Sequence, residues 1–277
     1  YKDWTNGDLK YASYVGLGGN CGPGNSWKCE TVDTSGNTGH YTSLALDSND
    51  LPHIAYVNMD AYRLRYALYN GVSWITEDVD PTTYCEFSSL ALDMAGHPHI
   101  SYYDRAFTNA NLKYAYKDAF GWHYQLVDST YDVGRWTSIA LDPALGIPAI
   151  SYFEFSRGRL KYARYVGTDG NCGPSSSWWC EEVDQVGAEG GYTSLALDDN
   201  GHPHISYYYG LDQYLRYAYF DGSTWQIETV DSAANVGYYT SLALDADYRI
   251  HILSLIHISE PTRLLSSSYA VFCLQKK

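Results

Sequence analysis

YTSLALDDNGHPHISYY, at residues 192–208, is the stretch that decides the fold of this chain. Apolar and polar side chains alternate with a period of two over 192–198 and again over 203–208, which is the pattern of a half-buried β-strand. Asp199, Asn200 and Gly201 lie between the two runs, and these residue types form tight turns. The stretch therefore predicts a β-hairpin.

The first half of this hairpin recurs along the chain. SLALD occurs at 43–47, 89–93, 194–198 and 241–245, and SIALD occurs at 138–142. Each complete unit continues with HISYY or a relative of it, then with LKYA or LRYA, and then with Trp followed by a segment such as E-x-V-D. Repeats of about 40–50 residues that hold four short strands have the size of propeller blades. The sequence therefore predicts an all-β fold, a β-propeller of four-stranded blades.

Four complete blades and two half blades account for most of the chain. Their expected extents are 1–33 for the first half blade, 41–80, 87–128, 136–184 and 192–231 for the complete blades, and 239–252 for the last half blade. The two half blades are complementary, so their pairing could close a five-bladed ring. A longer parent protein with more blades, and a β-sandwich, are the alternatives.

Residues 1–252 resemble the β-propeller repeats of secreted bacterial and archaeal surface proteins, and they are similar in style to fucose-specific lectin propellers. The turn DGSTW at 221–225 lies where sialidase-type propellers carry their Asp-box turn, with one residue fewer between Asp and Gly. The resemblance implies an extracellular or cell-surface protein with a recognition role.

The last stretch, 253–277, does not continue the repeat. Its segments LSLIHISEPTR and SYAVFCL resemble the translated adapter of a sequencing library. We therefore expect a non-native tail on a metagenomic fragment, and we leave this stretch out of the fold prediction. Its apolar part is too short to span a bilayer, so no membrane span is expected.

Two units carry a longer loop with the same cysteine spacing, NCGPGNSWKC at 20–29 and NCGPSSSWWC at 171–180. The repeated spacing predicts the disulfides Cys21–Cys29 and Cys172–Cys180, with free thiols and metal ligation as alternatives. Disulfides persist in oxidising compartments, which agrees with an extracellular location. Cys85, at the start of the first strand of a unit, is predicted to be a small buried residue.

The charge balance argues against two classes of partner. The chain has 18 Lys and Arg against 32 Asp and Glu, for a net charge of −14. Binding to nucleic acid or to an anionic membrane surface depends on clustered cations. Neither partner is expected, and a glycan or a surface protein is predicted instead.

The variable loops between the second and third strands of the units supply the candidate ligand-binding residues. A sugar site needs aromatic faces for stacking and planar polar groups for hydroxyls. The loop candidates are Asp60, Arg63, Asp104, Arg105, Glu154, Arg157 and Asp212, and the aromatic residues that open the first strands are Tyr41, Phe87, Trp136, Tyr192 and Tyr239. The alternative is that these residues are solvated loop charges and packing aromatics.

Regular histidines and aspartates are interpreted as structural. His53, His99, His204 and His251 open the second strands, but Ala149 takes this position in the third complete unit. The repeated aspartates that end the first and fourth strands are expected to cap turns. No metal site and no cofactor is predicted, with calcium on the Asp turns left open.

No catalytic residue is assigned from the sequence. The repeats favour multivalent binding over one asymmetric catalytic centre, so the chain is predicted not to be an enzyme. The prediction is a carbohydrate-binding propeller, with a protein-binding surface scaffold as the alternative. The second alternative is a sialidase-like glycoside hydrolase, which would require Arg63, Arg105 and Arg157 to converge on one pocket.

Overall fold

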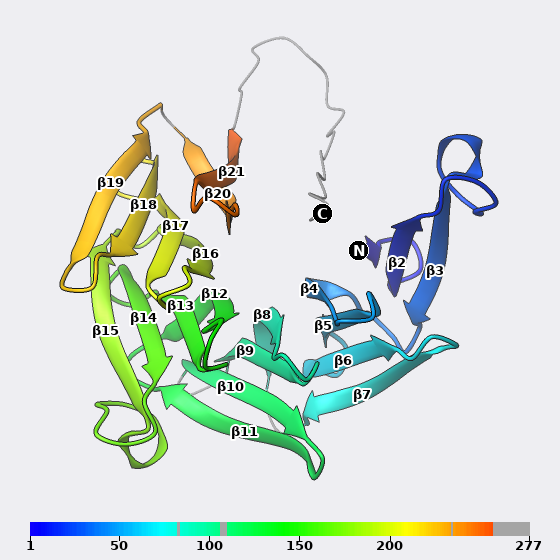
Figure 1. The fold of residues 1–277 in the computed structure, drawn as a ribbon, viewed down its shortest axis with the longest axis horizontal. Helices are drawn as coiled ribbons and strands as arrows, with labels where there is room; N and C mark the ends of the chain where they lie inside the picture. Colours follow the sequence, from blue (N-terminus) through cyan, green and yellow to red (C-terminus); the bar gives the residue numbers. More distant parts are fainter. Residues whose placement is uncertain (82–83, 106–109, 234, 257–277) are drawn as a thin grey trace.

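The computed structural model describes residues 1–81, 84–105, 110–233 and 235–256. Its strands form separate antiparallel sheets that stand around a common centre, as the blades of a propeller do (Figure 1). The predicted fold class is therefore confirmed. Residues 257–277, which make up most of the expected non-native tail, lie outside the described residues.

The chain passes through six sheets in sequence order. The first contains β1 (Lys2–Asp3), β2 (Asp8–Tyr14) and β3 (Trp27–Asp33), with the 3₁₀ turn η1 (Pro23–Asn25). The next two are β4 (His40–Leu46), β5 (Pro52–Asn58), β6 (Arg63–Tyr69) and β7 (Trp74–Asp80), and then β8 (Cys85–Leu92), β9 (Pro98–Arg105), β10 (Ala110–Asp118) and β11 (Gly121–Asp128).

The remaining sheets repeat this plan. They are β12 (Val133–Leu141), β13 (Pro148–Glu154), β14 (Arg159–Tyr165), the turn η2 (Pro174–Ser176) and β15 (Trp178–Gln185); β16 (Gly191–Leu197), β17 (Pro203–Tyr209), β18 (Tyr214–Phe220) and β19 (Trp225–Asp231); and β20 (Val236–Leu244) with β21 (Ile250–Ile256). In the described residues no helix is long and apolar enough to cross a membrane.

Each blade is a meander in which the strands pair in chain order. The first strands, β4, β8, β12, β16 and β20, lie next to one another around the centre, and the fourth strands lie at the outside (Figure 1). The two incomplete sheets, β1–β3 and β20–β21, stay separate. The pairing that could have closed a five-bladed ring is therefore not formed between the described strands.

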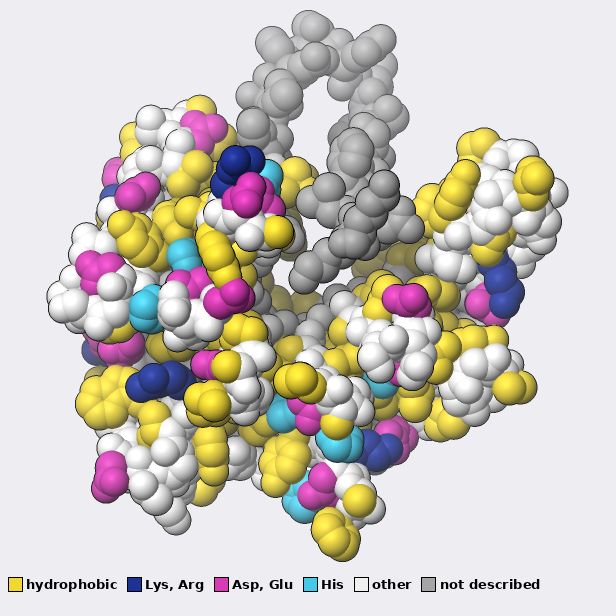
Figure 2. Space-filling model, viewed as in Figure 1, with side chains coloured by type: hydrophobic (Ala, Val, Ile, Leu, Met, Phe, Trp, Pro, Cys, Tyr) yellow, Lys and Arg dark blue, Asp and Glu magenta, His cyan; other side chains and the backbone are white. Residues whose placement is uncertain are grey.

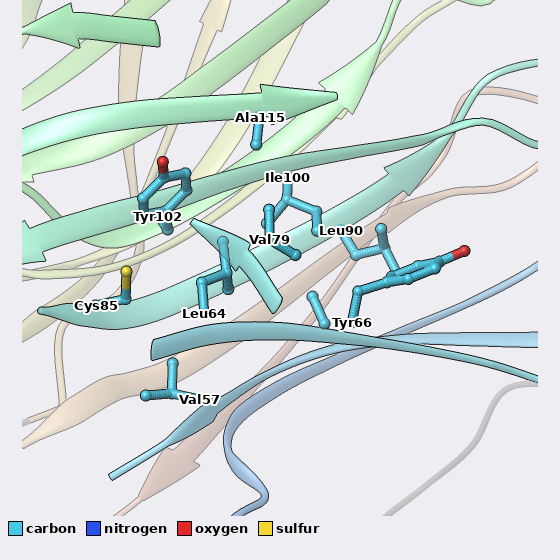
Figure 3. Packing of buried hydrophobic residues seen from close by; sticks show 10 residues of the cluster. Val57, Leu64, Tyr66, Val79, Cys85, Leu90, Ile100, Tyr102 and Ala115 are labelled. Carbon is cyan, nitrogen blue, oxygen red and sulfur yellow. The ribbon is translucent and has the colours of Figure 1, made fainter. Parts of the chain in front are cut away.

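The hydrophobic core lies between the blades. Figure 3 shows one such layer, where Val57 and Leu64 from the β4–β7 blade face Cys85 and Ile100 from the β8–β11 blade. Cys85 is fully buried there, as predicted. A sheet of this kind is apolar on both faces, so each blade needs neighbours to bury it.

A buried polar contact repeats at the first four of the five interfaces between neighbouring sheets. An Asp at the end of the fourth strand accepts a hydrogen bond from a Tyr on the second strand of the next blade, at 2.6–2.8 Å, and it pairs with a Lys or Arg on the third strand of that blade. We call this contact the interface triad. Its members are Asp33–Tyr56–Arg65, Asp80–Tyr102–Lys113, Asp128–Tyr152–Lys161 and Asp184–Tyr207–Arg216.

The turn-capping prediction is confirmed for all five first-strand aspartates and, among those that end the fourth strands, for Asp33, Asp128 and Asp231. Capping is only part of their role. One carboxylate oxygen of Asp128 accepts the backbone N–H of Thr130, as a turn cap does. The other oxygen takes part in the interface triad. The repeated E-x-V-D segment is therefore a turn signal and a contact between blades at once.

The hydroxyl groups of the repeated T-S-L segment join neighbouring first strands. Thr193 donates a hydrogen bond to the carbonyl oxygen of Trp136 at 2.8 Å, and Ser138 accepts one from the backbone N–H of Leu195 at 3.1 Å. The same serine contact links Ser43 to Leu90 at 3.0 Å. These bonds hold the innermost strands at a fixed spacing around the centre.

The structure joins Cys21 to Cys29 and Cys172 to Cys180, as predicted. The two loops differ in their surroundings. Trp178, beside the second disulfide, is fully buried and packs edge-on against Tyr114 of the preceding blade at 5.3 Å between ring centroids. Trp27, its counterpart in the first loop, is 36% exposed.

Candidate functional site

A β-bulge interrupts every first strand near its beginning. The register shifts just before the repeated serine in β4, β8, β12, β16 and β20. The aromatic residue in each bulge has a left-handed backbone, with φ of 49° at Tyr41, 52° at Phe87, 48° at Trp136, 53° at Tyr192 and 50° at Tyr239. Residues other than glycine rarely adopt this backbone conformation. Its recurrence at five equivalent positions points to a function or to a packing requirement.

The bulges direct the five aromatic side chains into one pocket at the centre of the propeller. Neighbouring rings contact one another, with centroids 4.7 Å apart for Tyr41 and Phe87, 5.4 Å for Phe87 and Trp136, 4.7 Å for Trp136 and Tyr192, and 4.6 Å for Tyr192 and Tyr239. The cavity measures about 560 Å³, and we call it the axial pocket. The residues that complete its lining are Thr42, Ser88, Thr137, Thr193 and Thr240.

The lining is apolar with polar tips. Burial raises the pKa of Tyr41 and raises that of Tyr192 to about 12, so both phenols stay protonated at neutral pH and can donate hydrogen bonds. The exposed fraction of Tyr239 is 65%, against 37% for Tyr41, so part of the ring is open to solvent. An aromatic wall with a few hydroxyl donors is suited to a ligand that has apolar faces and hydroxyl edges.

Ion pairs lie beside the axial pocket. Glu86 immediately precedes Phe87 and pairs with Arg105 at 2.9 Å, and Arg135 immediately precedes Trp136 and pairs with Asp132 at 2.7 Å. On the face drawn in Figure 2, Lys and Arg side chains (dark blue) lie next to Asp and Glu side chains (magenta) at several places.

The structure brings the predicted aromatic residues together, and it disperses the predicted loop charges. Asp104 is buried and pairs with Lys113, and Glu154 is buried and holds Arg157 with hydrogen bonds of 2.8 and 2.6 Å. Asp60 accepts the backbone N–H of Asn37 at 2.9 Å. Asp212 is exposed.

The three arginines of the hydrolase alternative have different partners. Arg63 pairs with Asp78 at 2.8 Å, Arg105 pairs with Glu86, and Arg157 pairs with Glu154 and Glu182 at 2.6 Å. Each arginine is thus held by carboxylates on its own blade. None of the three is among the residues that line the axial pocket.

Sequence reasoning missed the hydroxyl groups of the pocket. Thr and Ser directly follow the aromatic residue in every unit, at Thr42, Ser88, Thr137, Thr193 and Thr240. Their repetition was visible as the T-S-L segment, but strand alternation gave no reason to place them at the centre. The bulge turns the aromatic residue and its neighbour toward the axis, and this change of direction has no clear sequence signal.

The capping aspartates of the first strands hold backbone amides. Asp198, for example, accepts the N–H of Asn200 at 2.9 Å and that of His202 at 2.8 Å. Within the described residues no group of three or more His, Cys, Asp or Glu side chains is placed to hold a metal ion. The calcium alternative stays an untested expectation.

Comparison with protein-family models and with curated proteins finds no match. Solved structures with a similar fold include the α-L-arabinofuranosidase from Lactobacillus brevis, with a TM-score of 0.49 and 8% identity over 80% of this chain and 85% of that chain. The endo-arabinase from Bacteroides thetaiotaomicron has a TM-score of 0.48 and 11% identity, covering 80% of this chain and 90% of that one. An exo-β-1,3-galactanase from Clostridium thermocellum has a TM-score of 0.48 and 13% identity, covering 88% and 57%.

These similarities concern the fold. They contradict the prediction that the chain is not an enzyme, because the three proteins are by name an arabinofuranosidase, an arabinase and a galactanase. That prediction is withdrawn. None of the three is a fucose-specific lectin or a sialidase, so these two finer resemblances stay predictions.

Proposed function

We propose that the chain acts on carbohydrate and binds it in the axial pocket. The observation that carries this proposal is the ring of five contacting aromatic residues, one from each first strand, with a Thr or Ser beside each. A sugar presents C–H faces that stack on such rings and hydroxyl groups that meet their polar tips. The pocket volume of about 560 Å³ lies in the range of small-molecule sites.

The surroundings of the pocket fit this proposal. Glu86 and Arg105, together with Asp132 and Arg135, place planar donors and acceptors beside the aromatic ring. Two disulfides fit a protein that works outside the cytoplasm, where polysaccharides are encountered.

A panel of oligosaccharides, screened by calorimetry, tests the proposal. We expect Trp136→Ala to weaken the binding of any sugar ligand by about tenfold or more, because Trp136 contacts the rings on both sides of it. Tyr124→Ala, on an exposed tyrosine of the outer strand β11, serves as the control and should bind as the unchanged protein does. If no sugar binds, or if Trp136→Ala binds normally, the proposal is wrong and a protein ligand becomes the better hypothesis.

Cleavage of the bound glycosidic bond is the second candidate function. The observation that favours it is the position of Glu86, which immediately precedes the pocket residue Phe87 and pairs with Arg105 at 2.9 Å. Glycoside hydrolysis requires such carboxyl groups next to the sugar. Product analysis of the same oligosaccharides decides this point: hydrolysis should be lost in Glu86→Gln while sugar binding remains. Hydrolysis that persists in Glu86→Gln would exclude this residue from the reaction.

A further inference from the structure

Three of the four complete blades contain the same pair of side chains, a buried tyrosine and a buried or half-buried histidine, at the end of the molecule opposite the axial pocket. A histidine near the start of the second strand hydrogen-bonds through Nδ1 to a tyrosine hydroxyl on the third strand. The Nε2 atom of the histidine lies 3.9 Å from the capping Asp in the β4–β7 blade and 3.8 Å from it in the β8–β11 blade. The three pairs are His53–Tyr66, His99–Tyr114 and His204–Tyr217.

The β12–β15 blade keeps the tyrosine and lacks the histidine. Ala149 occupies the histidine position, in the same register opposite Ala140 as His204 has opposite Ala196. Tyr162 is as buried as its counterparts, at 4% exposure. Its hydroxyl has no hydrogen-bond partner among the described residues, and the oxygen atom itself is open to solvent.

A second substitution accompanies the first. In two other blades the residue that follows the third-strand Tyr-Ala is a tyrosine that stacks on the histidine ring, as Tyr219 stacks on His204 with an interplanar angle of 12°. Arg164 takes this position in the β12–β15 blade, and no ion pair holds it within the described residues. Both the imidazole and the ring that covers it are therefore replaced, by a methyl group and by a cation.

The two substitutions lie at a cavity of about 570 Å³ between the β12–β15 and β16–β19 blades, which we call the Ala149 pocket. Ala149, Tyr162 and Arg164 line it together with Asp142, the capping Asp of this blade. Trp179, which is 43% exposed, contributes an aromatic surface to the lining. The lining therefore carries the Tyr162 hydroxyl, the cation Arg164, the two carboxylates Asp142 and Glu181, and His202. Glu181 accepts a hydrogen bond from the Trp225 indole at 3.0 Å.

We propose that the Ala149 pocket binds a neutral imidazole-type nitrogen heterocycle that carries an anionic substituent. The ring nitrogen accepts the hydrogen bond of the Tyr162 hydroxyl, the ring N–H faces Asp142, and the anionic group reaches Arg164. Burial lowers the pKa of His53, His99 and His204, so the ring is uncharged in the equivalent place of the other blades. The proposal does not depend on the carbohydrate ligand, because the two pockets share no lining residue.

Calorimetry with two small probes tests the proposal on the full chain. Imidazole-4-acetate and histamine share the ring and differ in the charge of the side arm, and the measurement is made at about pH 8, where a free imidazole is uncharged. We expect imidazole-4-acetate to bind about tenfold or more tightly than histamine, because a charged hydrogen bond to Arg164 forms only with the acetate. Equal binding of the two probes, or binding of neither, overturns the proposal.

Variants locate the binding. Ala149→His restores the side chain of the other blades. It should abolish binding and raise the thermal midpoint, because the imidazole occupies the space beside Tyr162 and gives the Tyr162 hydroxyl a partner. Tyr162→Phe should weaken the binding of both probes, and Arg164→Gln should remove only the preference for the acetate. Unchanged binding in Ala149→His, with the variant folded, would place the probes elsewhere and overturn the proposal.

The β16–β19 blade offers a matched control. His204→Ala opens the same gap beside Tyr217, but Tyr219 stands where Arg164 stands in the Ala149 pocket. This variant should gain a second imidazole site that shows no preference for the acetate probe. If His204→Ala gains no site, a missing histidine alone does not make a heterocycle site, and the proposal is wrong.

Discussion

Trp136 illustrates how one residue serves two purposes. Its φ of 48° places the side chain in the axial pocket, and its carbonyl oxygen accepts the hydrogen bond of Thr193 from the next blade. A left-handed conformation costs a residue other than glycine about 1–2 kcal/mol. The contacts with Phe87 and Tyr192 and the bond from Thr193 offset this cost, so the strain is retained at all five equivalent positions.

This strain can be measured with a pair of variants. Trp136→Ala and Trp136→Gly remove the same ring contacts, but only glycine adopts a φ of 48° without strain. We expect Trp136→Gly to be more stable than Trp136→Ala by about 1 kcal/mol in urea unfolding. If the alanine variant is equally stable or more stable, the bulge is not strained.

At the scale of single residues, the sequence identified which positions belong to a site better than it identified what each residue does there. The aromatic residues were identified as candidates because they open each repeat, and the structure places them in one pocket. Ala149 was visible as an exception to the repeat, but its consequence depends on Tyr162, which lies on a different strand. A repeat shows which position departs from the pattern. The fold is needed to show which side chain loses its usual hydrogen-bond partner as a result.

At the scale of the elements, the interface triad determines how blades attach to one another. Asp128 is buried between two sheets and receives hydrogen bonds from Tyr152 and Lys161. A buried carboxylate that loses one hydrogen-bond donor keeps its full desolvation cost. Removing a single donor therefore lowers the free energy of unfolding substantially.

Tyr152→Phe should therefore lower the free energy of unfolding by about 1–3 kcal/mol. Urea unfolding measures this, with Tyr124→Phe on the exposed outer strand as the control. A loss in Tyr152→Phe no larger than in the control would mean that the triad contributes little to stability.

The two disulfides offer a second comparison between elements. On the chain-entropy model each closes a loop of similar length and stabilises by about 2.5 kcal/mol. The Cys172–Cys180 loop also holds the buried Trp178 against the preceding blade, whereas Trp27 beside Cys21–Cys29 is partly exposed. Replacing the second pair by alanine should therefore destabilise the chain more than replacing the first, measured by thermal unfolding. Equal losses would show that the loop does not support the interface.

At the scale of the whole molecule, the free energy of unfolding should depend on pH through the carboxylates of the interface triads. Burial opposes the charged forms of Asp33 and Asp128, but hydrogen bonds and the neighbouring cations outweigh it, so both pKa values lie below the usual value. A carboxylate with a lowered pKa stabilises the fold above the pKa of the unfolded state, about 3.9, and this contribution is lost as the pH falls through the folded value.

The free energy of unfolding should therefore fall as the pH is lowered below about 5. For Asp128→Asn this free energy should fall less steeply with pH than for the unchanged protein. Urea unfolding at a series of pH values measures the two slopes, with Asp212→Asn on an exposed loop as the control. An Asp128→Asn slope equal to that of the control would contradict this account.

The fold of the whole molecule was predictable because the repeat fixes it many times over. Turn residues, alternation and spacing gave the same answer in each unit, and the sheets form as expected. The sites were less predictable for the opposite reason. The axial pocket depends on bulges that reverse the direction of one residue, and the dispersed arginines depend on carboxylates of the same blade that repeat only weakly.

The interface triad has a consequence for ancestry. The blades β4–β7, β8–β11 and β12–β15 each offer an Asp to the blade that follows and a Tyr with a Lys or Arg to the sheet that precedes, so the contact recurs at four successive interfaces. A tandem copy of one unit carries both parts of this contact, the Asp and the Tyr with its Lys or Arg, at matching positions. Unequal recombination between such copies can lengthen or shorten the array by a whole blade, and every new junction inherits a working contact without further mutation.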